Sequence, residues 1–359
     1  MADSTNLIKQ IDVDGIIYDV YDRQAEHVLY YSSLSSAISD INNGVETNAI
    51  TDIDSAKVKV FTPHTGRLTV MLLDNITEST QIDINKSVDL VLNGKTLTFS
   101  ANGAYLDFKE NTNCRVDGTV NGSTITKTFS TATSSIRFII ARGKSFEISG
   151  GIYSLEGDNS SFNTMIALLA EYNEVRNCSL RTINKNISSG YARCVQNNAP
   201  TVFDNVEAYS EGYDTSCILV NSTIYVKNST LKSKTSNYRA RTILFGNSAS
   251  EVVATFENSL INGDAPDCHV DATSLASAIT VQPSNTVICN NTTIFGTHSG
   301  ISNNGNLYIN GGTYTGFSHG GVYVANGSEG ETYINDAVLR CGNYEGEFDY
   351  SDKTGDIYG

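Results

Sequence analysis

Charged residues are scarce in this sequence, and basic residues are scarcer than acidic ones. Of 359 residues, 18% are charged, with 24 Lys and Arg against 39 Asp and Glu, so the formal net charge is −15. No stretch gathers the basic residues into a patch, and a surface with this balance repels phosphate backbones and anionic lipid heads. We therefore expect neither nucleic acid nor a membrane surface as a partner.

Long hydrophobic runs are also missing. Nowhere do about 18 apolar residues follow one another, so no segment is long enough to cross a bilayer as a helix, and we expect no membrane insertion. The first residues, MADSTNLIKQIDVDG, lack the basic stretch and the apolar core of a signal peptide. We therefore expect synthesis in the cytoplasm, without a leader.

Cysteine patterns that indicate disulfides or metal sites do not occur. The seven cysteines are an odd number, and no two of them have CxxC spacing. This usage is typical of reduced cysteines that fill apolar space in the interior. Tryptophan is absent, and since no cofactor-binding motif is found, we expect no cofactor.

Small neutral side chains supply the polarity that charge does not. Asn, Ser, Thr and Gly are frequent, prolines number only four, and 40% of the residues are hydrophobic. Such a composition suits strands and turns better than helix surfaces, and it provides enough apolar residues for a sizeable core. It favours an all-β protein.

A short strand-like segment recurs along the chain. The stretch IYVKNSTLKS (224–233) has counterparts in VFDNVEAYS (202–210), ATFENSLIN (254–262) and LYINGGTYT (307–315). The unit is an apolar residue, a variable residue, a turn residue, two variable residues and usually a second apolar residue. The segments that fit this unit are Leu92-Gly94-Leu97, Val116-Gly118, Ile148-Gly150-Tyr153, Val175-Asn177-Leu180, Phe203-Asn205-Ala208, Val226-Asn228-Leu231, Phe256-Asn258-Ile261, Ile288-Asn290-Thr293, Ile309-Gly311-Tyr314 and Ile334-Asp336-Leu339.

The turn position of every segment is Gly, Asn or Asp. These residues tolerate positive φ, so each segment is interpreted as two strands joined by a bend through a left-handed residue. The segments start 21 to 32 residues apart, which is typical of coils that keep their strands and vary their loops. An apolar residue upstream of most segments indicates a third strand in each coil.

The residue before the turn tests this alignment independently. It is Arg176, Asp204, Lys227 and Glu257 in four successive segments. If the segments stack at about 4.8 Å, this outward column alternates in charge. We interpret it as a solvated ladder that keeps the register, in preference to a catalytic group.

This pattern, with Asn in short turns, resembles the right-handed parallel β-helix family that includes pectate lyases, polygalacturonases and bacteriophage tailspikes. The resemblance covers about residues 67–342. It implies an all-β, right-handed parallel β-helix of about ten coils. By the same resemblance to tailspikes, we expect a homotrimer.

The N-terminal residues differ in kind from the repeats. Residues 9–13 and 16–21 alternate apolar and polar residues around Asp14-Gly15, which predicts a β-hairpin. The string LIKQIDVDGIIYDVYD is similar to N-terminal segments of tail-fibre and appendage proteins of tailed phages of gut bacteria, where such a segment fixes the protein to the virion. The resemblance implies attachment to other virion proteins through the apolar residues Ile11, Val13, Ile16, Tyr18 and Val20.

A single amphipathic helix is predicted after the hairpin. Leu34, Ala37, Ile38 and Ile41 recur at helical spacing, with Ser32 or Ser33 as N-cap and Asn43-Gly44 as the stop. We expect this helix to cover the open first coil. The domains are then 1–30 (hairpin), 31–66 (capping helix and lead-in strands), 67–342 (β-helix) and 343–359 (acidic, glycine-rich tail).

No complete catalytic signature is found. Ser318-His319-Gly320-Gly321 is similar to one element of the polygalacturonase signature, but no NTD and no paired Asp precede it. The candidate catalytic carboxylates are Asp204, Glu207, Glu211 and Asp214, and the candidate metal ligands are Asp264, Asp267, His269 and Asp271. Solvated loop charge is the alternative for both groups, and a glycosidase would need two carboxyls on facing positions.

Candidate ligand-binding residues lie beyond the ends of the repeats. His298 and His319 are 21 residues apart, as are Thr293 and Tyr314, which predicts equivalent places on adjacent coils. Tyrosine offers an apolar face and a polar tip to a sugar ring. The candidate ligand-binding residues are Tyr209, Tyr213, Tyr238, Arg239, His298 and His319, with ordinary surface aromatics as the alternative.

Three functions fit these observations. The first is a non-enzymatic phage virion appendage, a tail fibre, tailspike or head-fibre subunit, which is held in the virion by its N-terminus and presents a β-helix to a host cell-surface polysaccharide. The second is a polysaccharide depolymerase, either a lyase or a glycoside hydrolase, on the same scaffold. The third is a purely structural spacer in the virion. A glycan-binding test and a sugar-release assay distinguish them.

Overall fold

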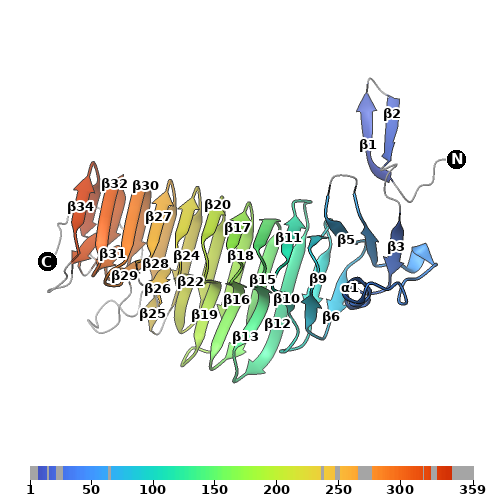
Figure 1. Ribbon diagram of the computed structural model, residues 1–359. Helices are drawn as coiled ribbons and strands as arrows, with labels where there is room; N and C mark the ends of the chain where they lie inside the picture. The colour runs from blue at the N-terminus through green and yellow to red at the C-terminus, as the bar shows by residue number, and fades with distance from the viewer. Residues whose placement is uncertain are drawn as a thin grey trace.

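The computed structural model (Figure 1) describes residues 7–13, 16–21, 27–63, 66–235, 238–246, 251–265, 277–317, 319–324 and 330–341, the first two ranges by their backbone alone. Nearly all of the regular structure is β, and most strands pair in parallel with strands 20 or more residues away in sequence. Figure 1 shows the strands side by side along one axis, from β5 near the N-terminal end to β34 near the C-terminal end.

The strands form three parallel stacks, and the chain visits them in the order A, B, C in each coil. Stack A pairs its strands in the order β5 (Leu68–Leu72), β8 (Val88–Val91), β11 (Asn113–Gly118), β14 (Ser145–Gly150), β17 (Tyr172–Arg176), β20 (Thr201–Asp204), β23 (Ile224–Lys227), β27 (Val253–Glu257), β30 (Thr286–Gly296), β32 (Asn306–Gly316) and β34 (Thr332–Asn335).

Stack B follows stack A after a bend, and β30 and β32 run through the bend and belong to both. Its other strands are β6 (Ile76–Glu78), β9 (Thr96–Phe99), β12 (Thr124–Ala132), β15 (Ile152–Asn159), β18 (Ser179–Asn184), β21 (Glu207–Glu211), β24 (Thr230–Lys234), β28 (Leu260–Asp264) and β35 (Val338–Cys341).

Stack C closes each coil. Its strands are β7 (Ile82–Ile84), β10 (Leu106–Phe108), β13 (Ile136–Ala141), β16 (Phe162–Leu168), β19 (Tyr191–Asn197), β22 (Asp214–Val220), β25 (Arg239–Ala240), β26 (Ile243–Phe245), β29 (Ile279–Val281), β31 (Ile301–Asn303) and β33 (Val322–Val324). Three long parallel stacks in an all-β chain are consistent with a parallel β-helix.

The core is built from columns of inward side chains. Pairing places equivalent residues of successive coils above one another, so one apolar position recurs in every coil. The column through stack A consists of Val116, Ile148, Val175, Phe203, Val226, Phe256, Cys289, Ile309 and Ile334. Each fully buried side chain of this size contributes roughly 1.5–3 kcal/mol of transfer free energy, so the columns dominate the stability of the fold.

Most of the predicted bends pass through a left-handed residue. φ is positive at Gly94, Gly150, Asn177, Asn205, Asn228, Asn258, Gly311 and Asp336. The chain turns from stack A to stack B at each of these residues. This confirms the prediction for these segments and explains why Asn, Gly and Asp recur there.

The prediction is wrong in two segments. Gly118 does not have positive φ; there the bend is widened into residues 119–123, where Gly122 has φ 87°. In the coil of β30 the left-handed residue is Asn291, with φ 48°, and not Asn290. Phe256 pairs with Cys289, so Cys289 is the inward residue and Ile288 faces outward, one residue away from the predicted register.

The N-terminal end is covered as expected. Helix α1 (Leu34–Asn43) begins after Ser33, whose side chain accepts a hydrogen bond from the Ser36 N–H, and ends at Gly44 with φ 66°. Leu34, Ala37 and Ile38 are buried in the same core as the coils. The helix is tied to the first coil by the Ser35 N–H, which donates to Glu78 at 3.0 Å.

The lead-in strands at this end pair in antiparallel fashion. β3 (Val28–Tyr31) pairs with β4 (Val58–Phe61), which pairs with β5, and the 3₁₀ turn η2 (Ile53–Ser55) precedes β4. The predicted hairpin is present as a separate two-stranded antiparallel sheet of β1 (Leu7–Val13) and β2 (Ile16–Tyr21). Figure 1 draws it beside the N-terminal end of the stacks.

The charge column is in register. Arg176 pairs with Asp204, Asp204 with Lys227, and Lys227 with Glu257. The Lys227 ammonium lies 3.1 Å from the Asp204 carboxylate. Lys227 and Arg176 lower the pKa of Asp204 against the opposing effect of its desolvation, which identifies this carboxylate as a stabilised anion.

The six described cysteines are free thiols, as the sequence predicts, while Cys268 lies outside the described residues. Of the helices in the described part of the chain, none has the length and apolarity needed to cross a bilayer.

Candidate functional site

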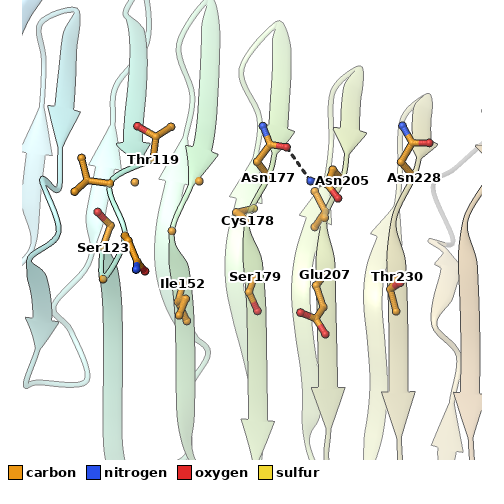
Figure 2. Close-up of a pocket in the computed structure, with 17 residues that line it drawn as sticks. Thr119, Ser123, Ile152, Asn177, Cys178, Ser179, Asn205, Glu207, Asn228 and Thr230 are labelled. Atoms are coloured by element: carbon orange, nitrogen blue, oxygen red, sulfur yellow. Dashed lines mark hydrogen bonds between the residues drawn. The ribbon is translucent and has the colours of Figure 1, made fainter. Parts of the chain in front are cut away.

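A groove of about 690 Å³ runs along the bends between stacks A and B. It crosses five successive bends, those of residues 118–123, 150–152, 177–179, 205–207 and 228–230. Figure 2 shows Asn177, Asn205 and Asn228 in one row across it. A groove that crosses successive coils is suited to a linear ligand that lies along the stacks.

The bends themselves create this groove. The widened bend 119–123 bounds one end, and the single-residue bends that follow leave space beside it. A Cβ on Gly150 would lie 2.8 Å from the carbonyl carbon of Gly118. The backbones of these two coils therefore approach closely, with no side chain between them. Val120 and Ile152 are about half exposed, at 47% and 52%, and give the lining apolar surface.

The polar groups of the groove are mainly neutral. The Asn205 amide donates to the Asn177 side-chain oxygen at 2.9 Å, which is the bond drawn in Figure 2. The Asn228 amide donates to Asp204 at 3.2 Å. Fixed amides can exchange hydrogen bonds with hydroxyl groups of a ligand without a charge on either side.

Glu207 is the single carboxylate among the residues that line the groove. Hydrolysis of a glycosidic bond by the two-carboxylate mechanism requires a second one across the scissile bond. The lining residues therefore suit binding better than cleavage.

The structure does not join the other candidate catalytic carboxylates into a pair. Asp204 lies on β20 in the charge column, and Glu211 at the end of β21 accepts a hydrogen bond from the Tyr209 hydroxyl at 2.8 Å. Asp214, at the start of β22, is 4% exposed and is held by both oxygens at 2.8 and 2.9 Å from Arg241. Each carboxylate has its own partner.

Of the predicted tyrosine candidates, Tyr213 and Tyr238 lie where stack B turns into stack C, and Tyr209 lies on β21 of stack B. Tyr213 and Tyr238 stack with ring centroids 4.8 Å apart and planes at 11°. The Arg239 guanidinium lies over the Tyr238 ring at 4.2 Å, and Arg181 lies over Tyr209 at 5.6 Å. The rings of Tyr213 and Tyr238 therefore stack on each other, Tyr238 and Tyr209 also contact an arginine, and the Tyr209 hydroxyl is bound to Glu211.

Sequence reasoning missed the neighbours of these tyrosines. Phe162 and Tyr191 pair on β16 and β19 and stack at 4.5 Å, and Arg193 lies 5.3 and 5.2 Å from their two ring centroids. Arg241 donates hydrogen bonds to both carboxylate oxygens of Asp214. The signal that could have found them is the third strand of each coil: Tyr191 and Arg193 alternate with inward residues in YARCVQN.

His298 and His319 lie together on adjacent coils, but the predicted equivalence of Thr293 and Tyr314 is wrong, because Thr293 pairs with Thr313. Their rings stack with centroids 4.0 Å apart and planes at 22°, and Tyr323 packs edge-on against His319 at 5.1 Å. Ile294 pairs with Tyr314, 20 residues later, while Ile301 pairs with Val322, 21 residues later. The segment from Tyr314 to Val322 is thus one residue longer than the segment from Ile294 to Ile301, and this additional residue lets His298 and His319 occupy equivalent places.

Burial, and to a smaller extent the adjacent His319, lower the pKa of His298 to about 4. The Nδ1 atoms of both rings are buried and have no hydrogen-bond partner. At ordinary pH His298 is therefore a neutral ring in this stacked contact and not a charged binding group.

Among the candidate metal ligands only Asp264, the last residue of β28, has a described position, while Asp267, His269 and Asp271 lie outside the described residues. In the part of the chain that is described, no group of three or more His, Cys, Asp and Glu could hold a metal ion.

The candidate attachment residues lie on the N-terminal hairpin. Ile11 pairs with Tyr18 and Val13 with Ile16, while Val20 pairs with Lys9. Their positions follow the predicted hairpin.

No protein-family model matches the chain, and neither the curated proteins nor the solved structures yield a similar protein. Proposals about its function therefore depend on its sequence and its geometry.

Proposed function

We propose that the protein is a phage virion appendage, a tail fibre, tailspike or head-fibre subunit, that binds a host surface glycan. In this proposal the stacks form a right-handed β-helix of about ten coils and the chain assembles as a homotrimer in the virion. The hairpin β1–β2 attaches to other virion proteins. The resemblance of LIKQIDVDGIIYDVYD to appendage segments and the separate sheet of the hairpin support the attachment.

One observation carries the binding proposal: a groove crosses five successive bends and is lined by amides, backbone and a single carboxylate. A polysaccharide is a linear ligand rich in hydroxyl groups, and it matches both the direction and the chemistry of this groove. The carboxylate pair that a hydrolase would need is missing from its lining, so binding without cleavage is the function supported best.

The test uses host polysaccharide and two readouts. We expect the purified protein to bind capsule or cell-wall polysaccharide of its host and to release no reducing ends or unsaturated products from it over hours. Glu207→Gln should keep binding within about threefold, since one exposed carboxylate contributes little.

Release of sugar by the wild-type protein, lost in Glu207→Gln, would establish the depolymerase instead. Absence of any binding to host polysaccharide or host cells would leave the structural spacer as the function.

A further inference from the structure

Three arginines gather on the outer face of stack C, although the chain is acidic. We name this surface the arginine face: Arg193 on β19, Arg239 on β25 and Arg241 just after it, with Asp214 between them. Asp214 pairs with Tyr191 on one side and with Arg239 on the other. Arg239 is thus two strands away from Tyr191 in the same row. Arg193 is two residues further along β19, so the backbones at Arg193 and Arg239 are roughly 12 Å apart at the usual strand spacing and rise per residue.

Arg193 is the unusual member of this face. Its side chain belongs to a residue only 9% exposed, and its Nε atom has no hydrogen-bond partner. Removing an ionised group from water without a counter-charge costs free energy. Burial accordingly lowers the pKa of the Arg193 guanidinium, and Asp214 is the carboxylate that opposes this effect.

Asp214 is already neutralised. Because Arg241 contacts both oxygens of Asp214, this carboxylate is not equally available as a counter-charge for Arg193 or Arg239. The Nε atoms of Arg239 and Arg241 are also buried without a hydrogen-bond partner. Three guanidinium groups and one carboxylate leave this face with a local charge of +2 (3 − 1), in a chain whose net charge is −15.

The aromatic rings beside the arginines form a flat border for this face. Phe162 and Tyr191 stack on each other, with planes at 5°, and Phe162 is 36% exposed. Tyr238 is held between Tyr213 and Arg239. Rings and guanidinium groups that are fixed in this way need little reordering when a ligand binds.

We propose that the arginine face binds the carboxylate groups of an acidic saccharide. Arg193 and Arg239 each bind one carboxylate of a chain that lies along the stacks, and Arg241, fixed by Asp214, adds positive charge between them. The inference rests on the proposed glycan-binding function and adds the class of sugar and its position.

Carboxylate is favoured over phosphate because this face already holds a carboxylate. One guanidinium nitrogen of Arg241 donates to both oxygens of Asp214, and a planar guanidinium can also match a carboxylate with two parallel hydrogen bonds.

The test titrates the full-length protein with oligogalacturonate and with oligosialic acid, each beside its methyl ester. We expect at least one acid to bind, its ester to bind at least about tenfold more weakly, and the affinity to fall with added salt. Arg193→Gln and Arg239→Gln should each weaken binding of that acid at least about tenfold. Arg193→Lys keeps the charge but loses the two-pronged geometry, and it should also weaken binding.

The matched control is Arg181→Gln on stack B, which removes one exposed arginine outside the arginine face and should change affinity less than twofold. Far-ultraviolet spectra and melting curves of all variants establish that they are folded, and Arg239, which is only half-buried, serves if Arg193 variants do not fold. The proposal is overturned if neither acid binds, if the esters bind as well as the acids, or if Arg181→Gln is as damaging as Arg239→Gln. Tighter binding of inorganic phosphate than of either acid would overturn the carboxylate assignment.

These outcomes differ from those that test the proposed function. If host polysaccharide binds equally well after its carboxyl groups are reduced to alcohols, the acidic-sugar inference fails and glycan binding stands. If the acids bind through Arg193 but host polysaccharide and host cells do not bind, the inference stands and the virion-adhesion function fails.

Discussion

Asn291 shows how much of the fold depends on single bend residues. It has φ 48°, and its side chain donates to the Asn258 side-chain oxygen at 2.9 Å in the neighbouring bend. Asn290, immediately before it, has ordinary strand geometry on β30. The two asparagines therefore have different roles despite their identical chemistry.

Replacing Asn291 by Val should lower the free energy of unfolding by about 1–2 kcal/mol, because a β-branched residue is strained at positive φ. Asn290→Val, on an outward strand position, should cost less than about 0.5 kcal/mol. Urea denaturation of both variants measures the difference. Equal losses in the two variants would contradict the register described for β30.

The register of β30 could not be read from the sequence because two adjacent residues compete for the inward position. Ile288 is larger and more hydrophobic than Cys289, so size alone favours Ile288, yet Cys289 is the residue that is fully buried. The double Asn that follows hides the shift, since either residue can take a left-handed conformation.

Lys127 is a residue whose role only coordinates could show. It occupies an inward position of β12, between Phe99 and Leu155, and is fully buried. Its ammonium donates to the backbone oxygens of Asn102 at 2.7 Å and Ala104 at 2.6 Å. The alternation of inward and outward residues along TITKTFSTA places Lys127 inside. The sequence does not show which backbone carbonyl groups would accept hydrogen bonds from its buried ammonium group.

At the scale of elements, the turn that holds His298 makes stability depend on pH. The folded state keeps His298 neutral down to about pH 4, whereas an unfolded chain protonates it near the ordinary value of 6.5. Between these values the unfolded state binds more protons, so stability rises with pH and is lost as pH falls from about 6.5 toward 4.

His298→Gln should therefore flatten the pH dependence of the unfolding free energy between pH 4 and 6.5. The expected change is about 1–2 kcal/mol across this interval, after a discount for solvent screening. Denaturation curves at several pH values measure it. A wild-type slope in His298→Gln would contradict a neutral His298 in the folded state.

Elements with strong local signals were predictable, and elements defined by distant partners were not. Ser33 and Gly44 mark helix α1 through their own capping geometry, and residues 14–15 mark the hairpin through its turn chemistry. The antiparallel pairing of β3 with β4 has no such local signal, because Val28–Tyr31 and Val58–Phe61 meet only across the capping region. The aromatic and arginine residues of stack C were missed for the same reason.

At the scale of the whole molecule, the hairpin and the stacks are separate sheets, as the attachment role proposed for the hairpin requires. β1 and β2 form a sheet of their own, whereas β3 belongs to the cap, where Tyr31 is fully buried. A deletion that ends before β3 therefore removes the hairpin without disturbing the cap.

Deletion of residues 1–26 should leave the melting temperature within a few degrees of wild type and abolish incorporation into particles. The control, deletion of residues 1–31, also removes β3 and should lower the melting temperature clearly, because the cap loses a strand and a buried tyrosine. Calorimetry and particle purification measure the two effects. Normal incorporation of the shorter deletion would show that the hairpin is not the anchor.

The stacking of the coils along one axis was the most predictable property of this molecule, because its sequence pattern recurs in every coil. Phe203, Val226 and Phe256 follow the same pattern because each rests on the one before it. The face proposed to bind a ligand has little such repetition: the residues paired with Arg193 in its column are Thr164 and Ser216. Residue types that recur at equivalent positions indicate how the core packs. A single sequence does not show which of the non-recurring residues form a binding site.

Because each strand rests on the strand one coil earlier, as Val226 rests on Phe203, the chain can be completed in order of its synthesis. The capped N-terminal end supplies a template when it leaves the ribosome, and every later turn of chain finds a finished edge to join. A nascent chain that stops midway would then be a shorter stack of coils with a complete N-terminal end. Premature termination would yield truncated but folded chains instead of aggregates.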